Sequence, residues 1–139
     1  MIRHIDPTPA AGLAMLRRGR AGPVVMLNLL RFRAVADYGA APELAPPVPI
    51  SGAAAYDRYV AHTLPYLHRS GGGVIGDFDG GAWLVGPDGE HWDRALLVRQ
   101  ASLDAFMAFA GDAAYGAGLG HRGAALLDSR LLPLLGRAA

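Results

Sequence analysis

The chain has 139 residues, 52% of them hydrophobic, which is enough for a single domain over residues 1–139 with a real core. Its 13 basic and 12 acidic residues give a formal charge of +1, whereas a nucleic-acid-binding protein would gather far more positive charge on one face. Because the sequence contains neither cysteine nor lysine, disulfides, thiolate nucleophiles, sulfur-ligated metals and lysine Schiff bases are excluded.

The first third of the chain predicts a helical extension, a buried strand and a loop. The opening MIRHIDPTPA lacks the apolar core of a signal peptide, and no apolar run is long enough to span a membrane, so we expect a cytoplasmic protein without membrane contact. Thr8 before Pro9 is typical of a helix start, within an N-terminal extension over residues 1–22. Residues 23–33 (PVVMLNLLRFR) form a strand that is apolar on both faces, which indicates that both faces are covered. Residues 36–50 contain four prolines and form either a surface loop or a lid over a pocket.

The rest of the chain alternates between helices and strands. A main helix over 51–69 begins at Ser51 and carries an apolar stripe, with Pro65 as the place for a kink or an early stop. Residues 74–86 predict a strand, a glycine bulge or turn, and a further strand, and residues 92–100 predict a buried strand. A helix begins at Ser102, a helical or turn-rich stretch runs to about residue 122, and a last strand covers 125–135, where Pro133 favours an edge position.

This order predicts an α+β fold, a ferredoxin-like βαββαβ plait with an antiparallel sheet and an extra short N-terminal helix. Helices cover only one face of such a sheet. Since the strands are apolar on both faces, the uncovered face needs a partner, and we expect a second copy of the chain to pack sheet against sheet.

Several stretches resemble the domain-of-unknown-function family numbered 1330, within the dimeric α+β barrel superfamily. They are MLNLLRF, SGAAAYDRYV, WDRALLVRQASLDAFMAF and HRGAALLDSRLL, which together cover roughly residues 23–135. The resemblance implies a homodimer with a pocket but no particular reaction, because the superfamily includes monooxygenases, haem-degrading enzymes, isomerases similar to muconolactone isomerase, and proteins that only bind small molecules.

Several polar residues interrupt the apolar strands. Asn28 needs a hydrogen-bond partner, which is either a core neighbour or a ligand, because a buried unpaired amide costs about 1–3 kcal/mol. Arg31 either pairs with Asp93 or Asp128 or captures a carboxylate with its planar fork. We expect Trp92 to form part of the pocket wall, with its indole N–H hydrogen-bonded at the pocket rim. The other candidate ligand-binding residues are charged and lie near the C-terminal end of the sequence: Arg122, Asp128 and Arg130. They form either an ion-pair network or part of an active site.

His62 and His121 are the general-base candidates, with Asp93 as a further catalytic candidate, because only histidine has an ordinary pKa near neutrality. The histidine spacing shows no metal-binding pattern, so we expect no metal. Asn28, Trp92 and His121 match the residue types that haem-degrading relatives use, but His121 lies too far along the chain. We therefore expect no haem and no other cofactor.

The sequence thus predicts a homodimer that binds a small apolar or acidic compound and acts as a cofactor-independent oxygenase or isomerase. The alternative is a non-catalytic ligand-binding or structural dimer module with the same polar residues as internal struts. The residues predicted to line the pocket are Asn28, Tyr56, Tyr59, His62, Trp92 and His121.

Overall fold

The structure is a computed structural model that describes residues 2–19 and 21–137. The predicted domain ends at residues 1 and 139 lie outside the described residues, as does residue 20 of the predicted N-terminal extension.

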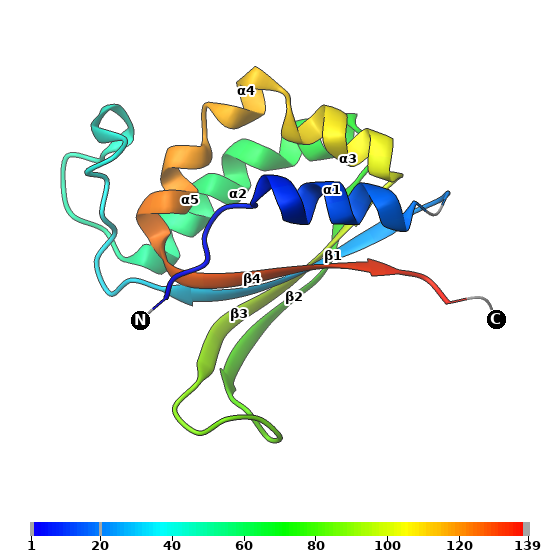
Figure 1. Ribbon diagram of the computed structural model, residues 1–139. Coiled ribbons are helices and arrows are strands. Elements are labelled where there is room, and N and C mark those ends of the chain that lie inside the picture. The colour runs from blue at the N-terminus through cyan, green and yellow to red at the C-terminus, as the bar shows by residue number, and fades with distance from the viewer. Residues whose placement is uncertain (1, 20, 138–139) are drawn as a thin grey trace.

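Four strands form one antiparallel sheet in the order β2-β3-β1-β4, and all the described helices lie on one side of it (Figure 1). This arrangement confirms the predicted α+β plait of ferredoxin-like type, with its extra N-terminal helix. In chain order the elements are α1 (Pro9–Arg18), β1 (Val24–Phe32), a short 3-10 helix (Pro42–Leu44), α2 (Gly52–Arg69), β2 (Gly73–Ala82), β3 (His91–Gln100), α3 (Leu103–Ala110), α4 (Ala113–Gly116), α5 (Leu119–Ala125) and β4 (Leu126–Leu135).

Side-chain caps start the longer helices where the sequence indicated. The hydroxyl groups of Thr8, Ser51 and Ser102 accept hydrogen bonds from backbone N–H groups three residues further on, over 3.0–3.1 Å. Pro65 lies on the exposed side of α2, and the helix continues past it to Arg69. The predicted early stop at Pro65 is therefore wrong, because a proline whose lost hydrogen bond faces water is tolerated when the rest of the helix packs against the sheet.

The strand predicted after the glycine pair of residues 80–81 is also wrong. β2 is a single strand with a register irregularity between Val74 and Gly76, and it ends at Ala82. The following residues form the exposed connection to β3 instead, with Leu84 fully solvent-accessible, and no strand of the described residues pairs with them. β4 lies at the sheet edge, as Pro133 indicated.

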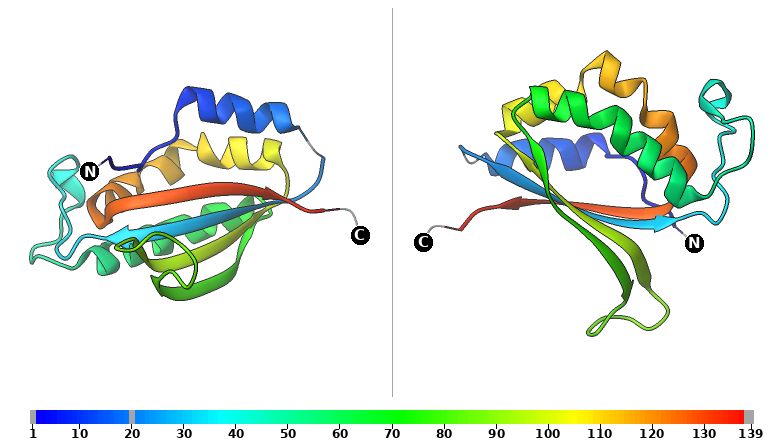
Figure 2. Two further views of the ribbon diagram at one scale, coloured as in Figure 1. Left: turned by 60° about the horizontal axis from the view of Figure 1, so that its bottom comes forward. Right: turned by 180° about the vertical axis from the view of Figure 1, so that it is seen from behind.

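The core lies between the sheet and the helices. Its largest cluster joins Leu30 of β1, Leu96 of β3, Leu126 of β4 and Tyr56 of α2, all at most 4% exposed. The β2–β3 hairpin bends away from the helices (Figure 2). Among the described residues, no helix is both long and apolar enough to cross a membrane.

The opposite face of the sheet, here called the open face, is not covered by any helix or strand of the described residues. Strand alternation and the pairing register place eight apolar residues on it: Val25, Leu27, Leu29, Phe78, Ala95, Leu97, Leu132 and Leu134. Leu132 is 52% exposed and Phe78 57% exposed. Only one of the two apolar faces predicted for β1 is therefore buried within a single chain.

The proline-rich loop over residues 36–50 is anchored to the helix layer. The backbone N–H of Ala36 donates to Ile50, and that of Asp37 donates to Ala124, both over 2.9 Å. Tyr38 from this loop is 9% exposed and belongs to the main core cluster. Part of the loop thus contributes to the core.

Candidate functional site

The predicted site residues fall into two clusters on opposite faces of the sheet. Leu30 of β1 packs in the helix-covered core, and its neighbour Arg31 points the other way, to the open face. The helix-side cluster contains Tyr56, Tyr59, His62, His121 and Arg122. The cluster at the end of the open face contains Arg31, Trp92, Asp93, Asp128 and Arg130. The structure therefore does not bring the predicted pocket-lining residues together in one place.

On the helix side, both candidate histidines hold neighbouring segments in place. His62 Nε2 lies 2.8 Å from the carbonyl oxygen of Ala114 and 3.2 Å from that of Tyr115, so its N–H joins α2 to α4. His121 Nδ1 lies 2.8 Å from the hydroxyl of Tyr38 and connects α5 to the proline-rich loop. Burial, together with the nearby Arg58 and His62, lowers the pKa of His121 below its ordinary value.

The helix-side tyrosines form a packed aromatic group. The hydroxyls of Tyr59 and Tyr115 are 2.7 Å apart, and the ring centroids of Tyr56 and Tyr59 are 5.3 Å apart. Burial raises the pKa of Tyr56 and of Tyr115 well above 10, so both phenols keep their protons at neutral pH. Arg122, with a side chain only 12% exposed, donates to the Ile5 carbonyl over 2.6 Å. These contacts are structural, and none of the residues named here lines the pocket described below.

Asn28 lies on the helix-covered face of β1, between Leu96 of β3 and Leu131 of β4. Among the described residues, its side-chain nitrogen makes a single long hydrogen bond, 3.3 Å, to the carbonyl of Met26 in its own strand. Asn28 therefore neither reaches the open face nor supports another side chain among the described residues.

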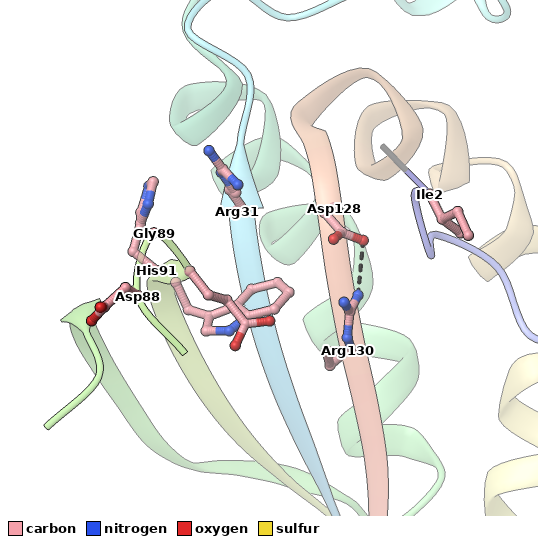
Figure 3. A pocket seen from close by; sticks show the side chains of 9 residues that line it. Ile2, Arg31, Asp88, Gly89, His91, Asp128 and Arg130 are labelled. Atoms are coloured by element: carbon pink, nitrogen blue, oxygen red, sulfur yellow. Dashed lines mark hydrogen bonds and ion pairs between the residues drawn. The ribbon is translucent and has the colours of Figure 1, made fainter. Parts of the chain in front are cut away.

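A half-open pocket of about 280 Å³ lies on the open face, between the end of the β2–β3 hairpin and the ends of β1 and β4 (Figure 3). Its charged and aromatic lining comes from three strands: Arg31 of β1, His91 and Trp92 of β3, and Asp128 and Arg130 of β4. The remaining lining comes from the connection before β3 and from the N-terminal segment: Asp88, Gly89, Glu90 and Ile2.

One wall of this pocket is a hydrogen-bonded network that holds the N-terminal segment against β4. Asp128 Oδ1 accepts hydrogen bonds from the His4 N–H at 2.8 Å and from Arg130 Nη1 at 2.9 Å, and Ser129 Oγ donates to the His4 carbonyl. Burial alone would raise the pKa of Asp128, but these hydrogen bonds and the charge of Arg130 outweigh it and lower the pKa. Asp128 and Arg130 therefore form one ion pair at this edge, within a network of hydrogen bonds to the N-terminal segment.

Trp92 is 5% exposed, and the guanidinium carbon of Arg130 lies 5.0 Å from its ring centroid. Its indole nitrogen is buried and has no hydrogen-bond partner among the described residues. The prediction that this N–H is satisfied at the pocket rim is therefore wrong. A buried indole donor without a partner is uncommon, because leaving such a group unpaired costs about 1–3 kcal/mol.

The predicted ion pair of Arg31 with Asp93 or Asp128 does not form. Asp93 instead accepts a hydrogen bond from the Phe32 N–H at 2.8 Å, and its other oxygen lies 3.6 Å from His91 Nε2. Sequence reasoning did not consider His91 as a site residue. The sequence spacing does indicate this pair, because residues two apart on one strand point their side chains to the same face, as His91 and Asp93 do.

The pocket lining combines two arginines, Arg31 and Arg130, with Trp92 and with the carboxylates of Asp88, Glu90 and Asp128, and the His91–Asp93 pair lies at one side. Such a set can bind an anion and move a proton. Within residues 2–19 and 21–137, no three histidine, aspartate or glutamate side chains come close enough together to hold a metal ion.

No family model matches the chain, and no curated protein is similar enough in sequence to match it. Two solved structures are similar over nearly the whole length. The RPA0582 protein of Rhodopseudomonas palustris, a protein of unknown function, is 36% identical, with a TM-score of 0.82 over 99% of this chain and 100% of that chain. The methylated RPA0582 protein is also 36% identical, with a TM-score of 0.85 over 99% of this chain and 98% of that chain. The chain therefore belongs to the same family as the RPA0582 protein.

Proposed function

We propose that the protein is a homodimer, joined through the open face of its sheet, that binds a small molecule in the open-face pocket. The observation that carries this proposal is the uncovered apolar face itself. Soluble monomers rarely expose a continuous apolar patch larger than a few hundred Å². Here eight apolar side chains from all four strands share one face, and Leu132 and Phe78 are more than half exposed.

The position of the pocket supports its assignment as the ligand site. It lies at the charged end of the open face, so a second copy of the chain packed on this face would border it and reduce its contact with water. The predicted membership in the family numbered 1330 and in the dimeric α+β barrel superfamily leads to the same arrangement. We also retain the predicted cytoplasmic location, since a sequence without cysteine suits a reducing compartment.

A catalytic role is favoured by the pair formed by His91 and Asp93. A carboxylate 3.6 Å from an imidazole nitrogen can help to orient the ring for proton transfer. Of the two reaction types predicted from the sequence, this pair favours an isomerase that works by proton transfer over an oxygenase. The alternative, a non-catalytic structural module, is supported by the network around Asp128, which ties the N-terminal segment to β4.

The dimer is tested by sedimentation velocity between about 1 and 100 µM. We expect the wild-type protein to sediment as a species with a molar mass of about twice the 14.5 kDa of one chain. Leu132→Arg places a charge on the open face and should yield monomers, because burying an unpaired charge in an interface is costly. The matched control is Leu119→Arg, since Leu119 is a 43% exposed leucine of α5 on the helix side, and it should remain dimeric. A monomeric wild type would contradict the proposed dimer.

The pocket is tested by the fluorescence of Trp92. In a Trp83→Phe background Trp92 is the sole tryptophan, and it lines the pocket. We expect a saturable change in its emission when neutral and acidic one-ring compounds such as phenol, benzamide and benzoate are titrated. If none of them changes the emission or stabilises the protein, ligand binding at this site is contradicted and the structural module is favoured.

A further inference from the structure

Arg31 is the pocket arginine that lacks a partner. It is half-buried near the end of β1, and its side chain makes no hydrogen bond and no ion pair with any described residue. Asp128 lies directly opposite it on β4. Arg31 and the Asp128–Arg130 pair flank the same space (Figure 3).

The two nearest carboxylates, those of Asp128 and Asp93, do not pair with Arg31, because each interacts with other groups. Asp128 receives hydrogen bonds from two backbone N–H groups and from Arg130, at 2.8–2.9 Å. Asp93 receives the Phe32 N–H at 2.8 Å and faces His91. Among the described residues, the Arg31 side chain is thus left without a hydrogen-bonded or ion-paired partner, while the hydrogen bonds of the two nearest carboxylates are made to other groups.

One aromatic side chain, that of Trp92, also lines the pocket with the small part of it that is exposed. Trp92 is 95% buried as a residue, and its indole nitrogen has no partner among the described residues. Arg130 is held over the Trp92 ring and cannot pair with Arg31, since both carry a positive charge. A guanidinium group presents its N–H donors in a planar fork that matches a carboxylate, and an aromatic wall suits a flat, apolar body beside that carboxylate.

We propose that the open-face pocket takes a small planar monocarboxylate, an aromatic or unsaturated acid, with Arg31 as the residue that binds its carboxylate group. This proposal rests on the proposed ligand-binding function and narrows its substrate class. The volume of about 280 Å³ suits a one-ring compound. Asp88 and Glu90 on the hairpin side disfavour a second negative charge on the ligand, and Glu90 is itself paired with the indole of Trp83.

The test compares benzoate with benzamide, which has the same shape without the charge, by isothermal titration calorimetry of the full chain. We expect benzoate to bind about tenfold or more tightly than benzamide, which is the usual size of a charge-assisted hydrogen-bond effect. Arg31→Gln should remove this preference. Arg17→Gln removes one positive charge from the exposed end of α1 and should leave the preference intact. Because the Arg31 side chain makes no hydrogen bond or ion pair with a described residue, Arg31→Gln should keep a melting temperature close to that of the wild type.

Several results would overturn the proposal, and they differ from a failure of the proposed function. Equal binding of benzoate and benzamide would contradict the carboxylate class and leave the pocket intact as a small-molecule site. Equal losses in Arg31→Gln and Arg17→Gln would show a general charge effect. If Arg31→Gln shifts the monomer–dimer equilibrium while benzoate binding stays unchanged, Arg31 pairs across the dimer interface and the assignment is wrong. Absence of benzoate binding to the wild type would contradict the proposal directly.

Discussion

Replacement of Gly52 by alanine adds a single methyl group and should nevertheless be strongly destabilising. Gly52 is buried at the start of α2, where the end of β1 meets the end of α5, and its N–H donates to the Arg33 carbonyl over 3.0 Å. A Cβ atom built on Gly52 would clash with the Arg33 carbonyl oxygen and lie 2.6 Å from that of Ala125 and 2.8 Å from the Arg33 nitrogen. All three neighbours are backbone atoms, so no flexible side chain can move aside.

The expected magnitude follows from what must shift. Overpacking of a fixed site costs about 1–3 kcal/mol. The backbone must also move at a junction where the Arg33 N–H donates to the Ala125 carbonyl over 2.9 Å, and losing one or two such bonds costs about 1 kcal/mol each. We therefore expect Gly52→Ala to lower the free energy of unfolding by about 3–4 kcal/mol, which corresponds to roughly 10 °C in melting temperature.

Urea unfolding followed by circular dichroism measures this change. The control is Gly123→Ala in α5, where a Cβ would meet nothing within 4 Å. This substitution should stabilise the protein by about 0.5–1 kcal/mol, because alanine restricts the unfolded chain and favours the helix. The description of close backbone packing at this junction would be contradicted if both variants changed the free energy of unfolding by the same amount. It would also be contradicted if Gly52→Ala were as stable as the wild type.

Three further predictions concern polar residues outside the pocket. Asn28→Leu should leave ligand binding unchanged and raise the free energy of unfolding by up to about 1 kcal/mol, since Asn28 makes only one long hydrogen bond on the helix-covered face; a clear loss of stability in urea would contradict this placement. The pKa of His121 is lowered in the folded state, so the unfolded chain binds the proton first and stability should fall as the pH drops below about 6.5. His121→Gln should reduce this slope between pH 7 and 5, and an unchanged slope would refute the assignment. Arg94→Leu should cost about 1–2 kcal/mol by thermal unfolding, because Arg94 bridges Asp77 of β2 and Asp57 of α2 at 2.8–2.9 Å, but both carboxylates are largely exposed and screened; a loss above about 3 kcal/mol would show that these pairs are stronger than their exposure allows.

The parts of the fold that depend on local chemistry could be predicted from the sequence. The capping residues Thr8, Ser51 and Ser102 and the apolar periodicity of α2 act within a few residues, so they identify the helices directly. The strand predicted after residue 82 failed for a non-local reason. Its residues are apolar, but a strand forms only where another strand is available to pair with it.

The candidate site could be predicted only in part, because it depends on which strand faces become neighbours. Arg31, Trp92 and Arg130 were named from the sequence and do line one pocket. Asn28 and His121 were assigned to the same pocket but lie on the other side of the sheet, since the sequence does not show which apolar face the helices cover. Trp92 and Arg130 are brought together by the strand order and register, which couple residues about 40 positions apart.

The most direct test of the central claim, that the open face joins two copies of the chain, is an isotope-filtered nuclear Overhauser measurement on a mixture of labelled and unlabelled protein. It detects methyl groups of one copy that lie within about 5 Å of protons of the other copy. This is close to the distance at which side chains are in contact. We predict intermolecular signals from Leu27, Leu29 and Leu132 on the open face. Signals only from Leu13 and Leu16 of α1, or no intermolecular signals at all, would contradict the account.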